Sequence, residues 1–189
     1  MNKQPTLKIS KIDAAKRQIE TAICLWFHSG EPVSIHTLIA AAHQILHDIG
    51  KKRHITTLLR GAQQIRPESR KNFQKIINRY ENFFKHADRD ADSLLDFNPV
   101  ATELYLLDAV LTYENLTQEY APILSTLKMW MFIQNPNFMN KVDRDKLLPL
   151  LKNKPELQST PKAIFFRDWH SMLLQSASGS IPKPSVSNT

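Results

Sequence analysis

The sequence predicts an all-α protein, a single helical bundle of six to eight helices. Apolar residues recur at three- and four-residue spacing in several segments, and this is the period of one face of an α-helix. The 189 residues contain no alternating strand pattern, no two-residue hairpin signal and no internal repeat. We expect one all-α domain over residues 1–175, followed by a disordered, Ser- and Pro-rich tail over residues 176–189.

Two helices open the chain, each with an apolar stripe between recognisable end signals. Ser10 followed by Asp13 is typical of a helix start, and the stripe that follows ends at Gly30. Ser34 is the expected N-cap of the second helix. Gly50 is expected to end that helix as its C′ residue, the position where glycine is most common.

A third, amphipathic helix is predicted after Pro67, which suits the first turn of a helix. A short helical piece over residues 56–65 precedes it. One face of the amphipathic helix is apolar and is expected in the core: Phe73, Ile76, Ile77, Tyr80, Phe83, Phe84 and Ala87.

Further helices are predicted in the second half of the chain. They cover residues 100–117 and 122–134, a short stretch capped by Asp143 and ending at Leu151, and a last helix that begins at Thr160-Pro161. In the helix over residues 100–117, Asp108 shares a face with Leu104, Leu107 and Leu111. We therefore expect its carboxyl group to be buried or nearly so.

The single cysteine and the amino-terminal residues indicate where in the cell the protein is located. Cys24 cannot form an internal disulfide, which indicates a reduced, intracellular protein, and its position within a helix predicts a small buried side chain. The first ten residues lack the apolar core of a signal peptide, and no run of about 18 apolar residues occurs to span a membrane. We expect a cytoplasmic protein with no membrane partner.

Positive charge is concentrated in one segment. The formal net charge is +7, and residues 51–86 alone hold ten Lys and Arg against two acidic residues. The positive electrostatic field of such a segment favours binding of a polyanion such as RNA, a nucleotide or an acidic protein. A solvated helix face that binds nothing would have the same composition. The chain lacks a Gly-rich phosphate loop, a Gly-x-Ser-x-Gly motif and a Cys-x-x-Cys motif, which disfavours nucleotide-driven motors, serine hydrolases and redox enzymes.

Arg79 and His86 are the first candidate pair for chemistry. They are seven residues apart, about 10.5 Å along a helix, so they share a face with Asn82 between them. An Arg matches phosphate oxygens bidentately, and a His exchanges protons near neutral pH. Together they could cleave RNA through its own 2′-hydroxyl without a metal: Arg79 would stabilise the anionic transition state, and His86 would act as general acid or base.

This segment, RYENFFKH over residues 79–86, resembles the motif of the HEPN families, in which an Arg is followed after four to six residues by a His on one helix of an all-α bundle. The resemblance implies an RNA-cleaving or RNA-binding protein that forms a homodimer, with two motifs facing each other. A polar residue usually follows the Arg in that motif. Tyr80 stands there in this chain, and Asn82 is the polar residue that could take its place. NFFKHADRD and LDFNP also resemble a group of uncharacterised bacterial proteins, a resemblance that implies no activity.

The second predicted helix offers an alternative site. His36, His43 and His47 lie on one side of it, and the four-residue spacing of His43 and His47 suits a shared metal. HDIGK, residues 47–51, resembles the signature of the HD-domain phosphohydrolases, whose adjacent His and Asp, here His47 and Asp48, bind a divalent metal. The other interpretation is that these histidines line an interhelical boundary or face solvent.

Two further interpretations stay open. Asp88, Asp90 and Asp92 alternate as in part of a calcium loop, but the turn glycine and the closing Glu are missing, so we expect them to cap the next segment or to pair with cations. The protein could also be a non-enzymatic helical interaction module. Its basic helix would then bind a partner protein or a nucleic acid through Lys71, Lys75 and Lys85.

Overall fold

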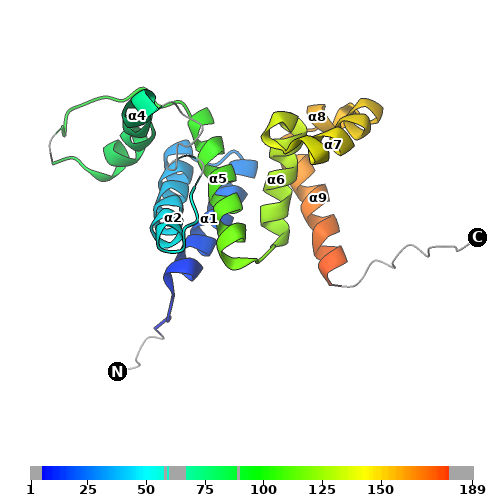
Figure 1. The fold of residues 1–189 in the computed structure, drawn as a ribbon, viewed down its shortest axis with the longest axis horizontal. Helices are drawn as coiled ribbons and strands as arrows, with labels where there is room; N and C mark the ends of the chain where they lie inside the picture. The colour runs from blue at the N-terminus through cyan, green and yellow to red at the C-terminus, as the bar shows by residue number, and fades with distance from the viewer. Residues whose placement is uncertain (1–5, 58, 60–66, 89, 179–189) are drawn as a thin grey trace, which may run out of the picture. The chain divides into compact units, whose positions relative to one another are not determined.

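The computed structural model describes residues 6–57, 59, 67–88 and 90–178, and of the side chains in residues 67–77 only those of Lys71 and Lys75. Every regular element within this range is helical, which confirms the all-α prediction (Figure 1). Contacts divide the chain into two compact units, residues 1–119 and 120–189, and each is described by itself. The expected single domain over residues 1–175 stays a prediction, and most of the expected tail lies outside the described residues.

Helix α1 (Lys11–Phe27) begins as its sequence predicts. The N–H of Asp13 donates to Oγ of Ser10 at 3.0 Å, and the N–H of Ser10 donates to Oδ2 of Asp13 at 3.1 Å, which is a capping box. At the other end Ser29, and not Gly30, has the left-handed φ of 55°. The N–H of Gly30 then donates to the carbonyl of Leu25 at 2.8 Å, which closes the helix with a Schellman motif.

Helix α2 (Pro32–Lys52) starts three residues earlier than expected. Glu31 is its N-cap, because the carboxylate accepts from the N–H groups of Val33 and Ser34, at 3.0 and 2.6 Å. The prediction of Ser34 as N-cap is therefore wrong. Pro32, which cannot donate a backbone hydrogen bond, occupies the first helical position, where no donor is needed.

The end of α2 also differs from the prediction. The helix continues through Gly50 to Lys52, and the left-handed residue after it is His54, with φ 59°. The N–H of Ile55 donates to the carbonyl of Gly50 at 2.9 Å, and a Cβ at position 50 would lie 2.6 Å from the carbonyl oxygen of Ile55. Glycine is therefore required at this position by the close approach of the following backbone, and not as the C′ residue.

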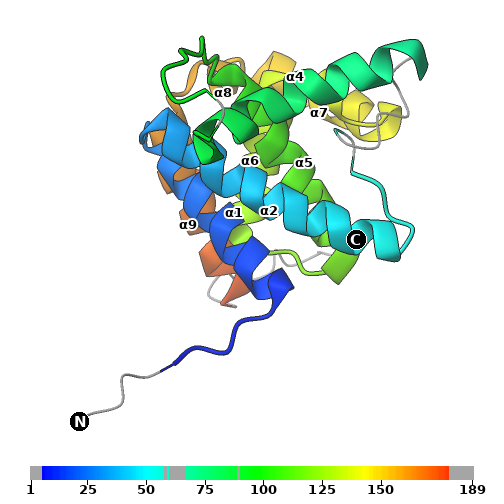
Figure 2. The same ribbon diagram turned by 90° about the vertical axis from the view of Figure 1, so that its left-hand side faces the viewer.

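Helices α1, α2 and α5 (Val100–Thr117) form the core of the first unit, and Figure 2 shows α1 and α2 side by side. Their inward residues are fully buried, among them Ile19 and Ile23 of α1, Ile39 and Leu46 of α2, and Leu106 and Val110 of α5. Asp108 is 2% exposed, which confirms the expected burial of its carboxyl group. Cys24 is exposed, so the prediction of a buried thiol is wrong.

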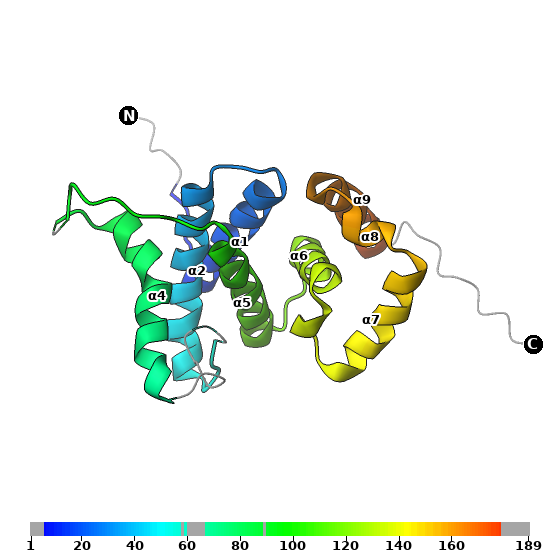
Figure 3. The same cartoon turned by 90° about the horizontal axis from the view of Figure 1, so that it is seen from above.

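Helix α4 (Pro67–Lys85) packs on α2 (Figure 3). Of its predicted core face, Tyr80, Phe83 and Phe84 are half-buried, whereas Ala87 follows the end of the helix and is exposed. The side chains of the other three members, Phe73, Ile76 and Ile77, are not among those described. Most of the short helical piece expected over residues 56–65 is likewise outside the described range, and Thr56 and Thr57 are not helical.

The second unit contains the helices predicted for this part of the chain and, between them, a 3₁₀ turn and a short helix that the sequence pattern did not predict. They are α6 (Pro122–Gln134), a 3₁₀ turn (Pro136–Phe138), α7 (Lys141–Asn153), α8 (Glu156–Ser159) and α9 (Lys162–Ala177). Asn140 caps α7, because its side-chain carbonyl accepts from the N–H of Asp143 at 3.0 Å; the expected cap at Asp143 is wrong. Helix α6 packs on α9, where the rings of Trp130 and Phe165 are 5.1 Å apart. None of the described helices has the length and apolarity needed to cross a membrane.

Candidate functional site

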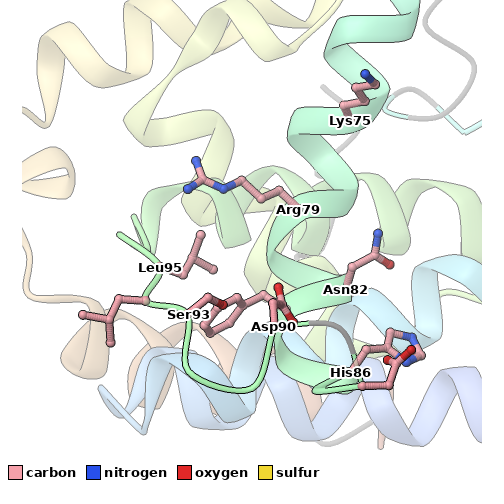
Figure 4. A pocket seen from close by; sticks show the side chains of 10 residues that line it. Lys75, Arg79, Asn82, His86, Asp90, Ser93 and Leu95 are labelled. Atoms are coloured by element: carbon pink, nitrogen blue, oxygen red, sulfur yellow. The ribbon is translucent and has the colours of Figure 1, made fainter.

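An open pocket of about 910 Å³ lies along the outward side of α4. It brings together the three residues predicted as catalytic and one of the three predicted to bind nucleic acid. Figure 4 shows how they follow one another down α4 and how the chain after the helix returns beside them. The described residues that line the pocket are Lys75, Arg79, Asn82, Phe83 and His86, together with Asp88, Asp90, Ser93, Leu94 and Leu95.

The α4 side of the pocket follows from helical spacing. Lys75, Arg79, Asn82 and His86 are separated by four, three and four residues, which places them in one row along the helix. His86 follows the last helical residue, but its N–H donates to the carbonyl of Asn82 at 3.0 Å, so the chain keeps helical geometry up to this point. All four side chains are exposed. They are therefore accessible to a ligand in the pocket.

The opposite wall comes from the segment between α4 and α5. The N–H of Ser93 donates to the carbonyl of Asp90 at 2.9 Å, which makes a turn and sends the chain back towards the helix. Leu94 and Leu95 follow this turn. Leu94 is 97% exposed, although burial of a large apolar side chain is energetically favourable. Leu95 is half-buried. The pocket thus has an apolar wall as well as polar ones.

Charge is distributed unevenly within the pocket. Lys75 and Arg79 supply positive charge from α4, and Asp88 and Asp90 supply negative charge from the segment that follows. Within the part of the chain that the structure describes, neither Lys75 nor Arg79 has an ion-pair partner, so both remain available to an anionic ligand. The pocket therefore has a cationic end and an acidic end.

The other two predicted nucleic-acid contacts do not line this pocket. Lys71 is exposed one helical turn before Lys75 and extends the same row. Lys85 lies elsewhere on the helix, where its ammonium group pairs with Glu81 at 2.8 Å. Because Glu81 is only 8% exposed, the pair is held against the body of the unit. The structure therefore separates Lys85 from the row formed by Lys71, Lys75 and Arg79.

The histidines of the alternative site have polar partners inside the first unit. Nε2 of His43 lies 2.7 Å from Oδ2 of Asp108, and the N–H of Leu59 donates to the same oxygen at 2.8 Å. His47 is 3.4 Å from the hydroxyl of Thr57 through Nδ1. Asp48, which neighbours His47, is exposed and accepts from the side chain of Gln44 at 2.8 Å. These groups do not converge on one point, and no three His, Cys, Asp or Glu side chains among the described residues are placed to hold a metal ion.

His36 links α4 to the helices beneath it. Its imidazole is fully buried, Nδ1 lies 3.0 Å from the hydroxyl of Thr102, and Nε2 has no hydrogen-bond partner among the described residues. Burial lowers the pKa of His36 to about 4, against a smaller opposing effect of Glu81. Four aromatic rings meet it edge to face at centroid distances of 5.1 to 5.8 Å: Tyr80 and Phe84 from α4, Phe97 from the segment before α5, and Tyr105 from α5.

The aromatic rings around His36 determine which side of α4 faces solvent. Tyr80 and Phe84 anchor α4 on the imidazole of His36, and these two residues alternate along the helix with Arg79 and Asn82. At 100° per residue, Tyr80 and Phe84 lie roughly 150° around the helix from Arg79 and Asn82, so packing of one side presents the other to solvent. The orientation of Tyr80 towards the core agrees with the prediction.

Comparisons of the chain with protein-family models, with curated proteins and with solved structures found no match. The function is therefore inferred from the chemistry of the pocket.

Proposed function

We propose that this protein binds RNA in the α4 pocket and cleaves it without a metal, with Arg79 and His86 as the working pair and Asn82 in support. The observation that carries the proposal is that all three side chains line one accessible pocket, next to Lys75. A HEPN-like identity, a homodimer and a cytoplasmic location belong to the same proposal.

Binding would begin with the cations. Arg79 and Lys75 are one helical turn apart, and Lys71 continues the row, so consecutive phosphates of a strand can be met by consecutive positive charges. Arg79 would hold the scissile phosphate through two parallel N–H donors, which a lysine cannot provide. Asn82, between Arg79 and His86, would donate its side-chain amide to a phosphate or ribose oxygen.

Cleavage would use the nucleophile that RNA itself supplies. The 2′-oxygen attacks the adjacent phosphorus and the bond to the 5′-oxygen breaks, which leaves a 2′,3′-cyclic phosphate and a 5′-hydroxyl. The 2′-hydroxyl loses a proton and the leaving oxygen gains one. His86 would carry out one of these transfers, and Arg79 would stabilise the extra negative charge on phosphorus.

A binding module without cleavage is the second candidate. The observation that favours it is that His86 is the one imidazole among the described lining residues, whereas the reaction moves two protons. In the catalytic proposal, the second group comes from a second copy of the chain.

The test is binding and cleavage of a fluorescent single-stranded RNA in the presence of EDTA. Arg79→Gln should weaken binding by about 5- to 50-fold, whereas Arg17→Gln, the same charge change on an exposed residue of α1, should leave it within about 2-fold. His86→Ala should abolish cleavage and retain binding, whereas His28→Ala should cleave normally. Binding that is unchanged in Arg79→Gln would overturn the proposal, and binding with no cleavage by the wild type would favour the binding module.

A further inference from the structure

The two ends of the α4 pocket suit different parts of a nucleotide, and the inference below rests on the proposed RNA-binding function. A phosphate is attracted to Lys75 and Arg79. It is repelled by Asp88 and Asp90, since like charges at close range destabilise a complex. A strand that placed phosphates along the whole pocket would therefore lose, by repulsion at the acidic end, the electrostatic binding energy that it gained at the cationic end. An uncharged part of the nucleotide fits the acidic end better.

The apolar wall of the pocket suits the face of a base. Leu94 is 97% exposed and lies in the lining with Leu95 and Phe83. A flat base placed against these side chains would cover an apolar surface that water now contacts, and contacts of this kind depend little on the identity of the base. This wall therefore explains binding of a base, but it does not choose between bases.

The carboxylate of Asp90 can discriminate between bases. An ionised carboxylate only accepts hydrogen bonds, so it pairs with the amino groups of cytosine, adenine and guanine. Uracil has no amino group, and its single N–H lies between two carbonyl oxygens that the carboxylate repels. In an RNA duplex the amino groups of cytosine and adenine lie at the deep, narrow groove, which is closed to side chains, so these groups can meet Asp90 only in an unpaired base.

We propose that the α4 pocket selects single-stranded RNA by an unpaired, amino-bearing base, with the phosphate on Arg79 and Lys75, the base face on Leu94 and Leu95, and its amino group on Asp90. Cytosine and uracil give the cleanest comparison, because the two pyrimidines are nearly equal in size and carry the same phosphates. The pocket should therefore prefer cytosine to uracil.

The test is fluorescence anisotropy with 2′-O-methyl oligomers of eight cytosines or eight uracils, which cannot be cleaved through the 2′-hydroxyl. The wild type should bind the cytosine oligomer about 5- to 50-fold more tightly. Asp90→Asn should reduce this ratio to below about 2, while its affinity for the uracil oligomer stays the same or rises. Asp92→Asn is the matched control: it removes the same charge from an exposed residue of the same segment that is not among the described lining residues, and its ratio should equal that of the wild type.

Three results would overturn the inference: equal affinity of the wild type for both oligomers, an unchanged ratio in Asp90→Asn, or an equal fall of the ratio in Asp92→Asn. If both oligomers bind with equal affinity and Arg79→Gln weakens both, base selection is wrong and the proposed function stands. If neither oligomer binds, the proposed function fails and the inference fails with it.

Discussion

Acidification from pH 7.5 to 5.0 should destabilise the first unit through His36. The imidazole is fully buried among four aromatic rings, its Nε2 has no hydrogen-bond partner in the part of the chain that the structure describes, and burial lowers its pKa to about 4 from the ordinary value of 6.5. Of the charged groups near it, Glu81 raises this pKa and Lys85 lowers it, both from α4. The folded protein therefore holds the neutral ring, whereas the unfolded chain takes up a proton below about pH 6.5.

The size of the effect follows from this difference. One pKa unit corresponds to about 1.4 kcal/mol, so the full penalty, reached below pH 4, is about 3 kcal/mol. Because the folded pKa lies below the unfolded one, the unfolded chain binds more protons between these values and stability falls as the pH falls. At pH 5.0 the loss relative to pH 7.5 is about 2 kcal/mol of unfolding free energy.

The assay is urea unfolding followed by circular dichroism at both pH values. His36→Phe keeps a planar ring among the aromatic side chains and removes the titrating group, so its loss of stability on acidification should be about 2 kcal/mol smaller than that of the wild type. The quantity compared is the change in unfolding free energy between the two pH values. The absolute stability of His36→Phe is not used, because the substitution also removes the hydrogen bond with Thr102. His86→Gln, at an exposed residue, should behave as the wild type. An equal pH dependence in His36→Phe and the wild type would refute the reasoning.

Three substitutions test the packing of the first unit by urea unfolding at neutral pH. Gly50→Ala should cost about 1–3 kcal/mol, because its Cβ would lie 2.6 Å from the carbonyl oxygen of Ile55; a loss no larger than that of Gly30→Ala, where the nearest atom is 3.1 Å away, would contradict this explanation. Ser10→Ala should cost about 1 kcal/mol through loss of the capping box, and an unchanged midpoint would argue against that cap. Asp108→Asn should cost about 1–3 kcal/mol, because one carboxylate oxygen accepts from both His43 and Leu59; full stability would show that these hydrogen bonds contribute little.

The helices were predictable wherever one local signal decided the structure. The capping box of α1 is such a case, because Ser10 and Asp13 are three residues apart and need no distant partner. The ends of α2 were harder. Ser34 and Gly50 both have the residue type of a cap, but Glu31 satisfies the first N–H groups, and Gly50 is needed for the approach of Ile55. Residue type gives the preference for a cap, whereas the path of the neighbouring chain decides where the cap lies.

The candidate site was predictable on its helical side only. The spacing of Arg79, Asn82 and His86 placed them in one row, and all three line the pocket. Ser93, Leu94 and Leu95 were missed, because a turn brings them back to α4 and no periodicity in the sequence reports a turn of this kind. The nearest available signal was the run of Asp residues from Asp88 onwards, which marks a break after the helix.

The role of His36 also lay beyond sequence reasoning. The stripe of His36, His43 and His47 suggested a metal or an interhelical boundary, and the structure pairs each of them with a polar group: Thr102, Asp108 and Thr57. Two of these partners lie more than sixty residues away along the chain, so only the tertiary packing of α2 on α5 reveals them.

The most direct test of the central proposal is single-turnover cleavage of one RNA in EDTA by the wild type and by His86→Ala. A matched oligomer in which every 2′-hydroxyl is replaced by hydrogen serves as the second substrate. We expect the wild type to cut the RNA, to leave 2′,3′-cyclic phosphate ends and to bind the deoxy oligomer without cutting it. His86→Ala should bind both oligomers but cut the RNA at least about 100-fold more slowly. Cleavage by His86→Ala at the wild-type rate, or cleavage of the deoxy oligomer, would contradict the proposed mechanism.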